Sequence, residues 1–359
     1  SIYAGKKDYL ASSAPHDYSV TGTNVDLTST RKAMDDFLVQ TGNQVNRKVE
    51  ASYLYFGIKE QEKNKLTIFS ENERKVLPKS IFLVFSQSTY KQLTGKDLNL
   101  TSNQVGLFTK NKTLKDQKSL SVNSQTYQIH DSLNDFLKGK VPNLFTVIVS
   151  DYSYLVVPDM DDFQESIKGT ATTQATYVGV NVKDPSHDAK KNSNLLDKIT
   201  DKETQQLAGQ TTGLPKSYFT ANSRYDAEGM VNGFVGGTFF IGIFLSIIFM
   251  LGTVLVIYYK QISEGYEDRE RFVILQKIGL DDLQVKQTIG KQVLTVFFLP
   301  LIFAFIHLAF AYHMISLIVR IIGVLNPDLM LVVTIIVCGV FFLAYVLVFA
   351  LTSRSYRRI

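Results

Sequence analysis

The sequence predicts a membrane protein in which an α+β extracellular domain is followed by three transmembrane α-helices. Two observations lead to this fold class. The mean hydropathy of the chain is near zero, at +0.03, but this average combines two unlike parts. Residues 1–228 hold 28 of the 38 Lys and Arg and 26 of the 33 Asp and Glu, whereas the long apolar runs lie in residues 229–359. The first part is long enough to bury a core of its own.

Residues 1–228 mix strand and helix signals, and we expect one α+β domain. Short segments rich in β-branched and aromatic residues predict strands. These are 51–58, 65–70, 80–86, 104–109, 124–130, 143–150 and 176–182. Helical spacing of apolar residues predicts helices at about 28–48, 87–94, 131–138 and 193–209. Thr30 is the expected N-cap of the first helix.

The composition of this domain points to binding rather than catalysis. Its nearly balanced charge argues against nucleic acid as a partner, because nucleic acid requires a basic face. His16, His130 and His187 are far apart in sequence and lack metal-ligand spacing, so no metal site is predicted. There is no Gly-x-Ser-x-Gly motif, and the single cysteine, Cys338, lies in an apolar run. The four carboxylates of 158–165 suit a cation or a solvated acidic loop, and their spacing favours the loop.

Three apolar runs are long enough to cross a bilayer, which requires about 20 residues. They define predicted transmembrane helices at 229–259, 292–320 and 329–353. The alternative is that these are buried helices of a large soluble protein. Three charge-free runs of this length favour the membrane.

The distribution of Lys and Arg predicts the orientation of the spans. Segment 260–291 carries six basic residues and the tail 354–359 adds three, which places both in the cytoplasm. The turn 321–328 and the domain 1–228 then face outward. The chain starts at Ser1 without an initiator Met or a signal peptide, so we expect it to be the C-terminal part of a longer, multi-pass membrane protein.

Three glycines at the start of the first span are spaced four residues apart. Gly229, Gly233 and Gly237 would allow close approach of another helix, and we assign them to helix packing. A flexible hinge between domain and helix is the alternative. No acidic residue lies inside any span, so the spans offer no evident solute pathway.

The charged segment between the first two spans is expected to be a cytoplasmic amphipathic loop of two short helices. Acidic residues favour a helix start at "SEGYEDRERF", and Phe272, Leu275 and Ile278 then share one face. Gly279 would end the first helix and Asp281 would cap the second. An apolar stripe with charged shoulders is typical of a docking surface for a partner, while a solvated linker is the alternative.

The string "EGYEDRERFVILQKIGL", between one span and two more, resembles the C-terminal part of FtsX-like ABC transporter permeases. The residues that match the Glu/Arg-rich stretch and the ending of this family are Arg269, Glu270, Arg271, Lys277, Ile278 and Gly279. The longer string "VIYYKQISEGYEDRERFVILQKIGL", followed by "FFLPLIFAFIHLAFA", resembles the subgroup that gives Gram-positive bacteria resistance to bacitracin and lantibiotics.

The resemblance implies a cell-membrane permease subunit of ten spans, with a large outer domain between the seventh and eighth. A separate ATPase subunit would bind the cytoplasmic face, in line with the lack of a Gly-x-x-x-x-Gly-Lys-Ser/Thr loop here, so this subunit would be non-catalytic and need no cofactor. The resemblance also implies that the protein recognises peptide antibiotics or their complexes with lipid-linked cell-wall precursors, and that it contacts membrane lipid. A histidine kinase that receives a signal from the permease is a further implied partner.

On the motif and the apolar stripe we assign docking of the ATPase to one set of residues. They are Glu267, Arg269, Glu270, Arg271, Phe272, Leu275, Lys277 and Ile278. Residues that contact the ligand have no motif to identify them. Two alternatives stay open: an FtsX-like mechanical transducer in cell-wall or lipoprotein processes, and an antibiotic-sensing receptor without ATPase that is coupled to a histidine kinase.

Overall fold

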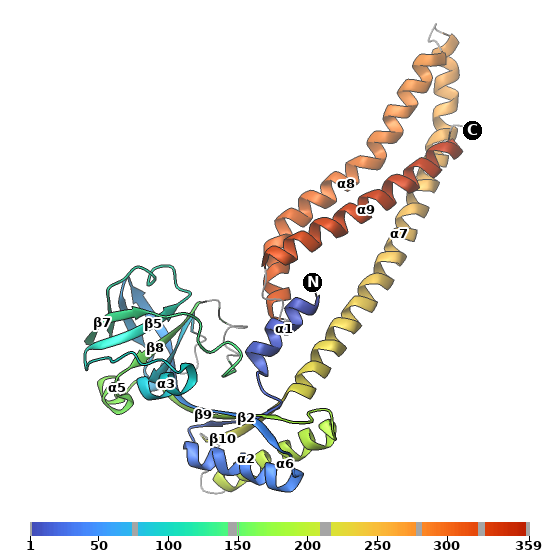
Figure 1. The fold of residues 1–359 in the computed structure, drawn as a ribbon. Helices are drawn as coiled ribbons and strands as arrows, with labels where there is room; N and C mark the ends of the chain where they lie inside the picture. Colours follow the sequence, from blue (N-terminus) through green and yellow to red (C-terminus); the bar gives the residue numbers. More distant parts are fainter. Residues whose placement is uncertain are drawn as a thin grey trace. The chain divides into compact units, whose positions relative to one another are not determined.

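The computed structural model describes residues 2–73, 78–142, 149, 151–208, 217–277, 282–321 and 327–356. Contacts between residues divide the chain into two units, Tyr3–Val231 and Asn232–Ile359, the latter grouped with Ser1–Ile2. The first unit is rich in β-strands and the second consists of long apolar helices (Figure 1). The predicted fold class, an α+β domain followed by three apolar helices, is confirmed.

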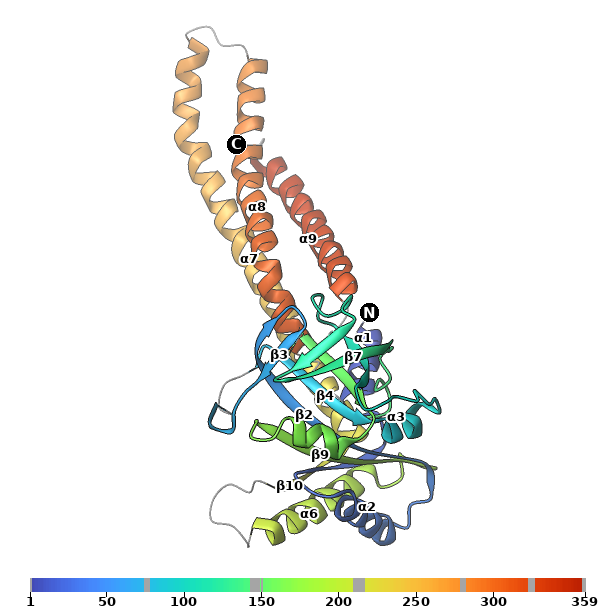
Figure 2. The same cartoon turned by 90° about the vertical axis from the view of Figure 1, so that its left-hand side faces the viewer.

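Four antiparallel strands form the first layer of the Tyr3–Val231 unit. Their order is β10 (Tyr218–Ser223), β1 (Tyr18–Thr23), β9 (Thr172–Val182) and β2 (Val45–Glu62). Helices α2 (Leu27–Thr41) and α6 (Ala189–Ala208) lie side by side against this sheet (Figures 1 and 2). Apolar side chains of strand and helix, such as Val178 and Phe37, form the buried core between them.

The second layer is a ring of seven strands, because the pairing closes on itself. It runs from β2 through β3 (Lys65–Ile68), β6 (Ser119–Val122), β7 (Gln125–Ser132), β5 (Gln104–Thr109) and β8 (Asp151–Val157) to β4 (Ser80–Ser86), which pairs with β2. Alternate residues of these strands point inward and fill the ring, as in a small barrel. Leu54, Phe82 and Leu155 are examples of this core.

Strand β2 belongs to both layers. It pairs with β9 from Val45 to Phe56 and with β4 from Tyr53 to Ile58. One strand of 18 residues therefore connects the four-stranded sheet to the ring without a linker.

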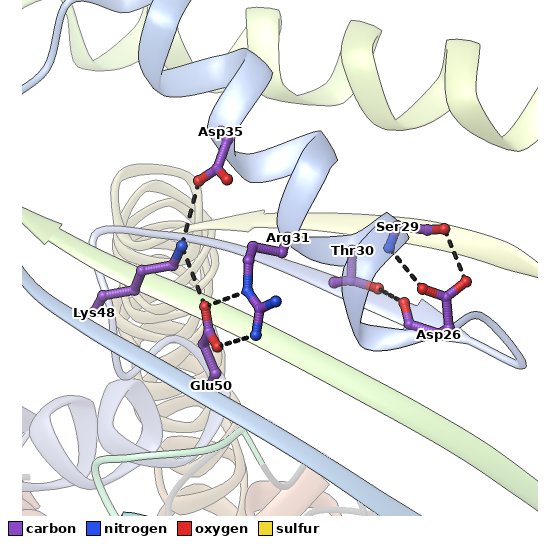
Figure 3. A network of polar contacts seen from close by, with 7 residues as sticks. All are labelled: Asp26, Ser29, Thr30, Arg31, Asp35, Lys48 and Glu50. Atoms are coloured by element: carbon purple, nitrogen blue, oxygen red, sulfur yellow. Dashed lines mark hydrogen bonds and ion pairs between the residues drawn. The ribbon is translucent and has the colours of Figure 1, made fainter.

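Helix α2 shows why one predicted cap is wrong. The side chain of Asp26, not Thr30, accepts the hydrogen bond from the Ser29 backbone N–H, at 2.8 Å (Figure 3). The buried Thr30 hydroxyl instead lies 2.7 Å from the Thr176 hydroxyl. The helix ends at Thr41 rather than near residue 48, because Gly42 takes a left-handed conformation (φ 67°) and β2 begins three residues later.

Other predictions can be compared with the described elements. Helix α3 (Gln87–Thr94) and strands β4 and β5 have the predicted bounds. The predicted helix at 131–138 is wrong, because Asp131 and Ser132 belong to β7 and pair with β5. The predicted strand 143–150 lies outside the described residues except for Val149. Elements that the sequence did not predict are β1, β6, β8 and β10, with α1 (Ile2–Ser13), α5 (Met160–Ser166) and a 3-10 turn at Glu71–Glu73.

The second unit contains three long helices. They are α7 (Arg224–Lys277), which starts in the first unit, α8 (Asp282–Ile321) and α9 (Pro327–Tyr356). Each has a stretch long and apolar enough to cross a membrane: Arg224–Val256, Phe298–Ile318 and Met330–Leu347. Helices α8 and α9 contact each other, with the Phe298 ring 5.4 Å from the Phe349 ring.

The charged segment after the first span differs from its prediction. Helix α7 is continuous from Arg224 to Lys277, so residues 260–277 extend the first span and do not begin a separate helix. Glu, Arg and Leu favour helix, and one glycine, Gly265, is tolerated at a cost of about 1 kcal/mol. The next helix, α8, starts at Asp282, and residues 278–281 lie outside the described part of the chain.

Candidate functional site

Strand β10 passes directly into helix α7, without a loop. Ser223 is the last residue of β10 and Arg224 is the first of α7. The Ser223 hydroxyl accepts a hydrogen bond from the Asp226 backbone N–H at 3.1 Å and donates to the Asp226 carboxylate at 2.7 Å. This reciprocal pair resembles a capping box and fixes the direction in which the helix leaves the sheet.

Helix α6 is bonded to the same corner. Ser193 of α6 is buried, its hydroxyl lies 2.8 Å from the Ser223 hydroxyl, and it also donates to the Asp226 carboxylate. One carboxylate therefore connects α6, β10 and α7. Asp226 also raises the pKa of Asp197 on α6, although burial of Asp197 is the larger cause.

Arg224 ties the start of α7 to the chain that leads into β1. Its guanidinium donates hydrogen bonds to the carbonyl oxygens of Pro15, at 2.6 Å, and Ala14, at 3.3 Å. Its backbone N–H donates to the Asp17 carbonyl at 2.9 Å. The guanidinium also lies 3.9 Å from the Asp17 carboxylate.

Asp17 extends these contacts to the end of β9. Its buried carboxylate accepts a hydrogen bond from the Val182 N–H at 3.0 Å, and its own N–H donates to the Asn181 side chain at 3.1 Å. We call Asp17, Ser193, Ser223, Arg224 and Asp226 the joint. It connects the first turn of α7 to β1, β9, β10 and α6.

A buried histidine lies next to the joint. His16 is 1% exposed, its Nδ1 is 2.7 Å from the Tyr177 hydroxyl, and its Nε2 has no hydrogen-bond partner among the described atoms. Gly179 lies directly against this ring, because a Cβ there would be 2.5 Å from Nδ1. Burial, with smaller contributions from Arg47 and Arg224, lowers the pKa of His16 to about 4. The imidazole is therefore neutral at physiological pH.

The joint attaches helix α7 to the sheet through several elements at once. An edge strand and three further elements are fixed to one helix by hydrogen bonds, so a displacement of α7 must act on the sheet. The described parts of the chain contain no group of three or more His, Cys, Asp or Glu side chains placed so that they could hold a metal ion. The acidic segment after β8 has a structural role, because Asp159 caps α5 by accepting from the Asp161 and Asp162 N–H groups.

The residues predicted to dock an ATPase fall at the end of α7. Those from Glu267 to Lys277 lie in its final turns, Lys277 is exposed, and Ile278 is outside the described residues. Gly229, Gly233 and Gly237 lie within the continuous helix, and a Cβ at any of them would meet nothing within 4 Å. A packing partner for these glycines would therefore have to come from another segment or chain.

Sequence reasoning missed the joint, although one local signal was present. The pattern Ser223-Arg224-Tyr225-Asp226 is close to a capping box and precedes the apolar run. The predicted domain boundary at residue 228 follows the onset of hydrophobicity, whereas α7 starts four residues before Glu228.

An open groove of about 730 Å3 lies beside the joint, between the first turns of α6 and Tyr225.

No family model matches this chain. Curated relatives do match over part of it, and all three are permeases of Bacillus subtilis (strain 168). The uncharacterized ABC transporter permease YvcS is 30% identical over 119 residues, which is 33% of this chain and 17% of YvcS. The ABC transporter permease protein YxdM is 36% identical over 72 residues, or 20% of this chain and 12% of YxdM.

The third relative is the bacitracin export permease protein BceB, 28% identical over 138 residues, which is 38% of this chain and 19% of BceB. The similarity is to ABC transporter permeases. The matched segments span less than a fifth of the length of each relative. Permease relatives and three helices able to cross a membrane together indicate a multi-pass membrane protein.

Proposed function

We propose that this chain is the C-terminal part of the permease subunit of an ATP-driven transporter that gives resistance to peptide antibiotics such as bacitracin or lantibiotics. The observation that carries the proposal is its similarity to ABC transporter permeases, one of them named for bacitracin export. The FtsX-like motif at Arg269–Arg271 and Lys277–Gly279 supports the same family.

In this proposal the Tyr3–Val231 unit faces the outside of a Gram-positive cell membrane. It binds the antibiotic, or the antibiotic together with its lipid-linked cell-wall precursor. The end of α7, together with Ile278 that follows it in the sequence, docks a separate ATPase subunit through the eight residues assigned above. The permease subunit itself hydrolyses no ATP. A histidine kinase is a further proposed partner, which would receive a signal from the same permease.

The mechanism follows from the joint. ATP hydrolysis at the cytoplasmic end of α7 would displace a helix that is continuous up to Arg224. The hydrogen bonds of Arg224 and Asp226 would pass this displacement to β1, β9, β10 and α6, and so change the affinity of the outer domain for its ligand. A helix fixed to a sheet in this way also supports the second candidate, an FtsX-like mechanical transducer in cell-wall or lipoprotein processes.

The deciding experiment uses the full-length parent protein, purified in mild detergent from its own cells. We would measure whether an ATPase subunit co-purifies and whether bacitracin or a lantibiotic changes its rate of ATP hydrolysis. A co-purifying ATPase that responds to drug is the expected result. An ATPase without a drug response would favour the mechanical transducer, and no ATPase at all would favour the kinase-coupled receptor.

A further inference from the structure

Within the described part of the chain, a short stretch of β2 has a strand on one side and an open edge on the other. From Arg47 to Glu50, β2 pairs with β9 on one side, and β4 joins its other side only from Tyr53 onward. The register with β9 shifts between Val45 and Arg47, and irregularities of this kind redirect side chains at sheet edges.

A small cavity lies at this open edge, where α3 and the segment before residue 142 approach β2. Its volume is about 190 Å3. The residues that line it are Arg47, Lys48, Val49, Glu50, Gln92, Leu93 and Lys140. Three of them are basic and one is acidic.

The acidic lining residue is already neutralised. The Glu50 carboxylate accepts two hydrogen bonds from the Arg31 guanidinium, at 3.0 and 2.7 Å, and lies 3.2 Å from Lys48 Nζ (Figure 3). These contacts, led by the hydrogen bonds to Arg31, lower the pKa of Glu50. Lys48 in turn reaches Asp35 at 3.3 Å. Glu50 is therefore engaged with Arg31 and Lys48, and its charge does not offset the other two cations.

Those two cations, Arg47 and Lys140, have no carboxylate partner among the described residues. Lys140 Nζ donates one hydrogen bond, at 2.7 Å, to the Leu93 carbonyl. Burial of Lys140, and next the nearby Arg47 charge, lower its pKa. Two positive charges that repel each other thus face one half-enclosed cavity.

We propose that this pocket binds a phosphate or pyrophosphate group between the Arg47 guanidinium and the Lys140 ammonium. The guanidinium fork matches phosphate oxygens in two-point hydrogen bonding, and the ammonium supplies a compact point charge. Gln92 adds an amide that can donate to a further oxygen. Pockets for drug-sized ligands usually measure about 300–1,000 Å3. A cavity of about 190 Å3 is smaller, so it suits the head group of a ligand rather than a whole peptide antibiotic.

The phosphate can come from a lipid-linked precursor or from a soluble phosphate compound. The chemistry of the pocket is the same for both sources. Only the lipid source depends on the proposed function, in which the outer domain recognises such a precursor.

Isothermal titration of the full chain in detergent with inorganic pyrophosphate tests the pocket. We expect saturable heat for the wild type, and an affinity reduced about tenfold or more in Arg47→Gln and in Lys140→Gln, as for the loss of one charge-assisted contact. Lys112→Gln is the matched control, because Lys112 is exposed and forms no ion pair among the described residues. Arg47 is also exposed, so its substitution leaves the fold intact.

Absence of saturable heat, or equal affinity in the wild type and both pocket variants, would overturn the proposal. Saturable binding of a peptide antibiotic that Arg47→Gln leaves unchanged, without any pyrophosphate heat, would instead assign the open edge to strand addition and would also overturn it.

Competition by vesicles separates the two sources. Phosphatidylcholine vesicles that contain a polyprenyl pyrophosphate should displace inorganic pyrophosphate if the ligand is a lipid, whereas failure to displace it supports a soluble phosphate. The proposed pocket and the proposed transporter function can be refuted independently of each other. Pyrophosphate binding without a co-purifying ATPase would leave the pocket standing, and a drug-responsive ATPase without pyrophosphate binding would leave the transporter standing.

Discussion

The Arg224 guanidinium, in the first turn of α7, donates a 2.6 Å hydrogen bond to the carbonyl oxygen of Pro15, just before β1. The two residues are 209 positions apart in sequence. The segment that enters the four-stranded sheet and the helix that leaves it are thus held together. The start of α7 is therefore attached to the two neighbouring strands β1 and β10 at one edge of the sheet.

Arg224→Gln should loosen this connection. The substitution removes the charged donor for Pro15 and Ala14, and hydrogen bonds from charged groups contribute about 1.5–3 kcal/mol. We expect local stability to fall by about 2 kcal/mol, because the side chain is partly exposed. Hydrogen exchange measured by mass spectrometry should show faster exchange at β1 and β10. The variant Lys112→Gln should leave exchange there unchanged, and equal protection in wild type and Arg224→Gln would contradict the role of Arg224.

Asp226→Asn tests the contacts that connect α6 and β10 to the first turn of α7. The Ser193 and Ser223 hydroxyls both donate to the Asp226 carboxylate, and an amide is a weaker acceptor than a carboxylate. We expect a loss of about 1–2 kcal/mol of local stability at the α6–α7 contact. The pKa of Asp197 should also fall towards its ordinary value, since Asp226 contributes to raising it.

Asp201→Asn is the matched control for this change. Asp201 is an exposed residue of α6 that also raises the pKa of Asp197, but it forms no described bond to α7. Hydrogen exchange at residues 189–231 should therefore respond to Asp226→Asn and not to Asp201→Asn. An equal response of both variants would mean that only the charge of Asp226 matters, and not its position in the joint.

Local pattern explains which parts of this fold the sequence could predict. The run "SIFLVFS" of β4 and the three apolar runs are dense in residues that favour one structure. Strand β4 has the predicted bounds, and helices α7, α8 and α9 pass through the apolar runs. Strands β1 ("YSVTGT") and β10 ("YFTANS") mix strand-favouring Tyr, Val, Phe and Thr with Gly, Ser, Ala and Asn, which dilute the strand signal. They are strands because they pair with each other and with β9.

The joint was hidden for a related reason. The bonds of Asp17 and Arg224 connect residues about 165 to 210 positions apart, such as Asp17 with Val182 and Arg224 with Ala14. The bonds of Ser193 to Ser223 and Asp226 span 30 and 33 positions. No periodicity within a short window records such pairs. Only the cap formed by Ser223 and Asp226 is local, and it precedes the apolar run that marks the first span in the sequence.

Charge reversal at the end of α7 tests the proposed docking of an ATPase. Arg269→Glu together with Arg271→Glu should abolish co-purification of the ATPase subunit from cells, because a surface selected for complementary charge becomes repulsive. Hydrogen exchange in the Tyr3–Val231 unit should stay unchanged, since both substitutions lie outside it. Lys112→Glu, a charge reversal in the Tyr3–Val231 unit, is the control. Undiminished co-purification would sink the assignment of these residues.

The buried imidazole of His16 predicts a pH dependence of the stability of the Tyr3–Val231 unit. Its pKa is about 4 in the folded protein and 6.5 in the unfolded reference, because burial disfavours the charged ring. Between these values the unfolded chain binds a proton that the folded domain does not, so stability falls as pH decreases from 6.5 to about 4. Above pH 6.5 this group has no further effect, and the total loss is about 3 kcal/mol.

The measurement is the thermal unfolding midpoint of the Tyr3–Val231 unit, followed by circular dichroism of the full chain in detergent across this pH window. His16→Asn keeps an acceptor for the Tyr177 hydroxyl but cannot titrate, so it should flatten the acid side of the profile. His187→Asn is the control, because His187 is exposed and its substitution should leave the slope unchanged. Other acidic and basic groups contribute equally to all three profiles, so the difference between wild type and His16→Asn isolates this one histidine. A slope that persists undiminished in His16→Asn would mean that the ring is protonated in the folded domain, and that its unpaired Nε2 finds a partner when the protein is in solution.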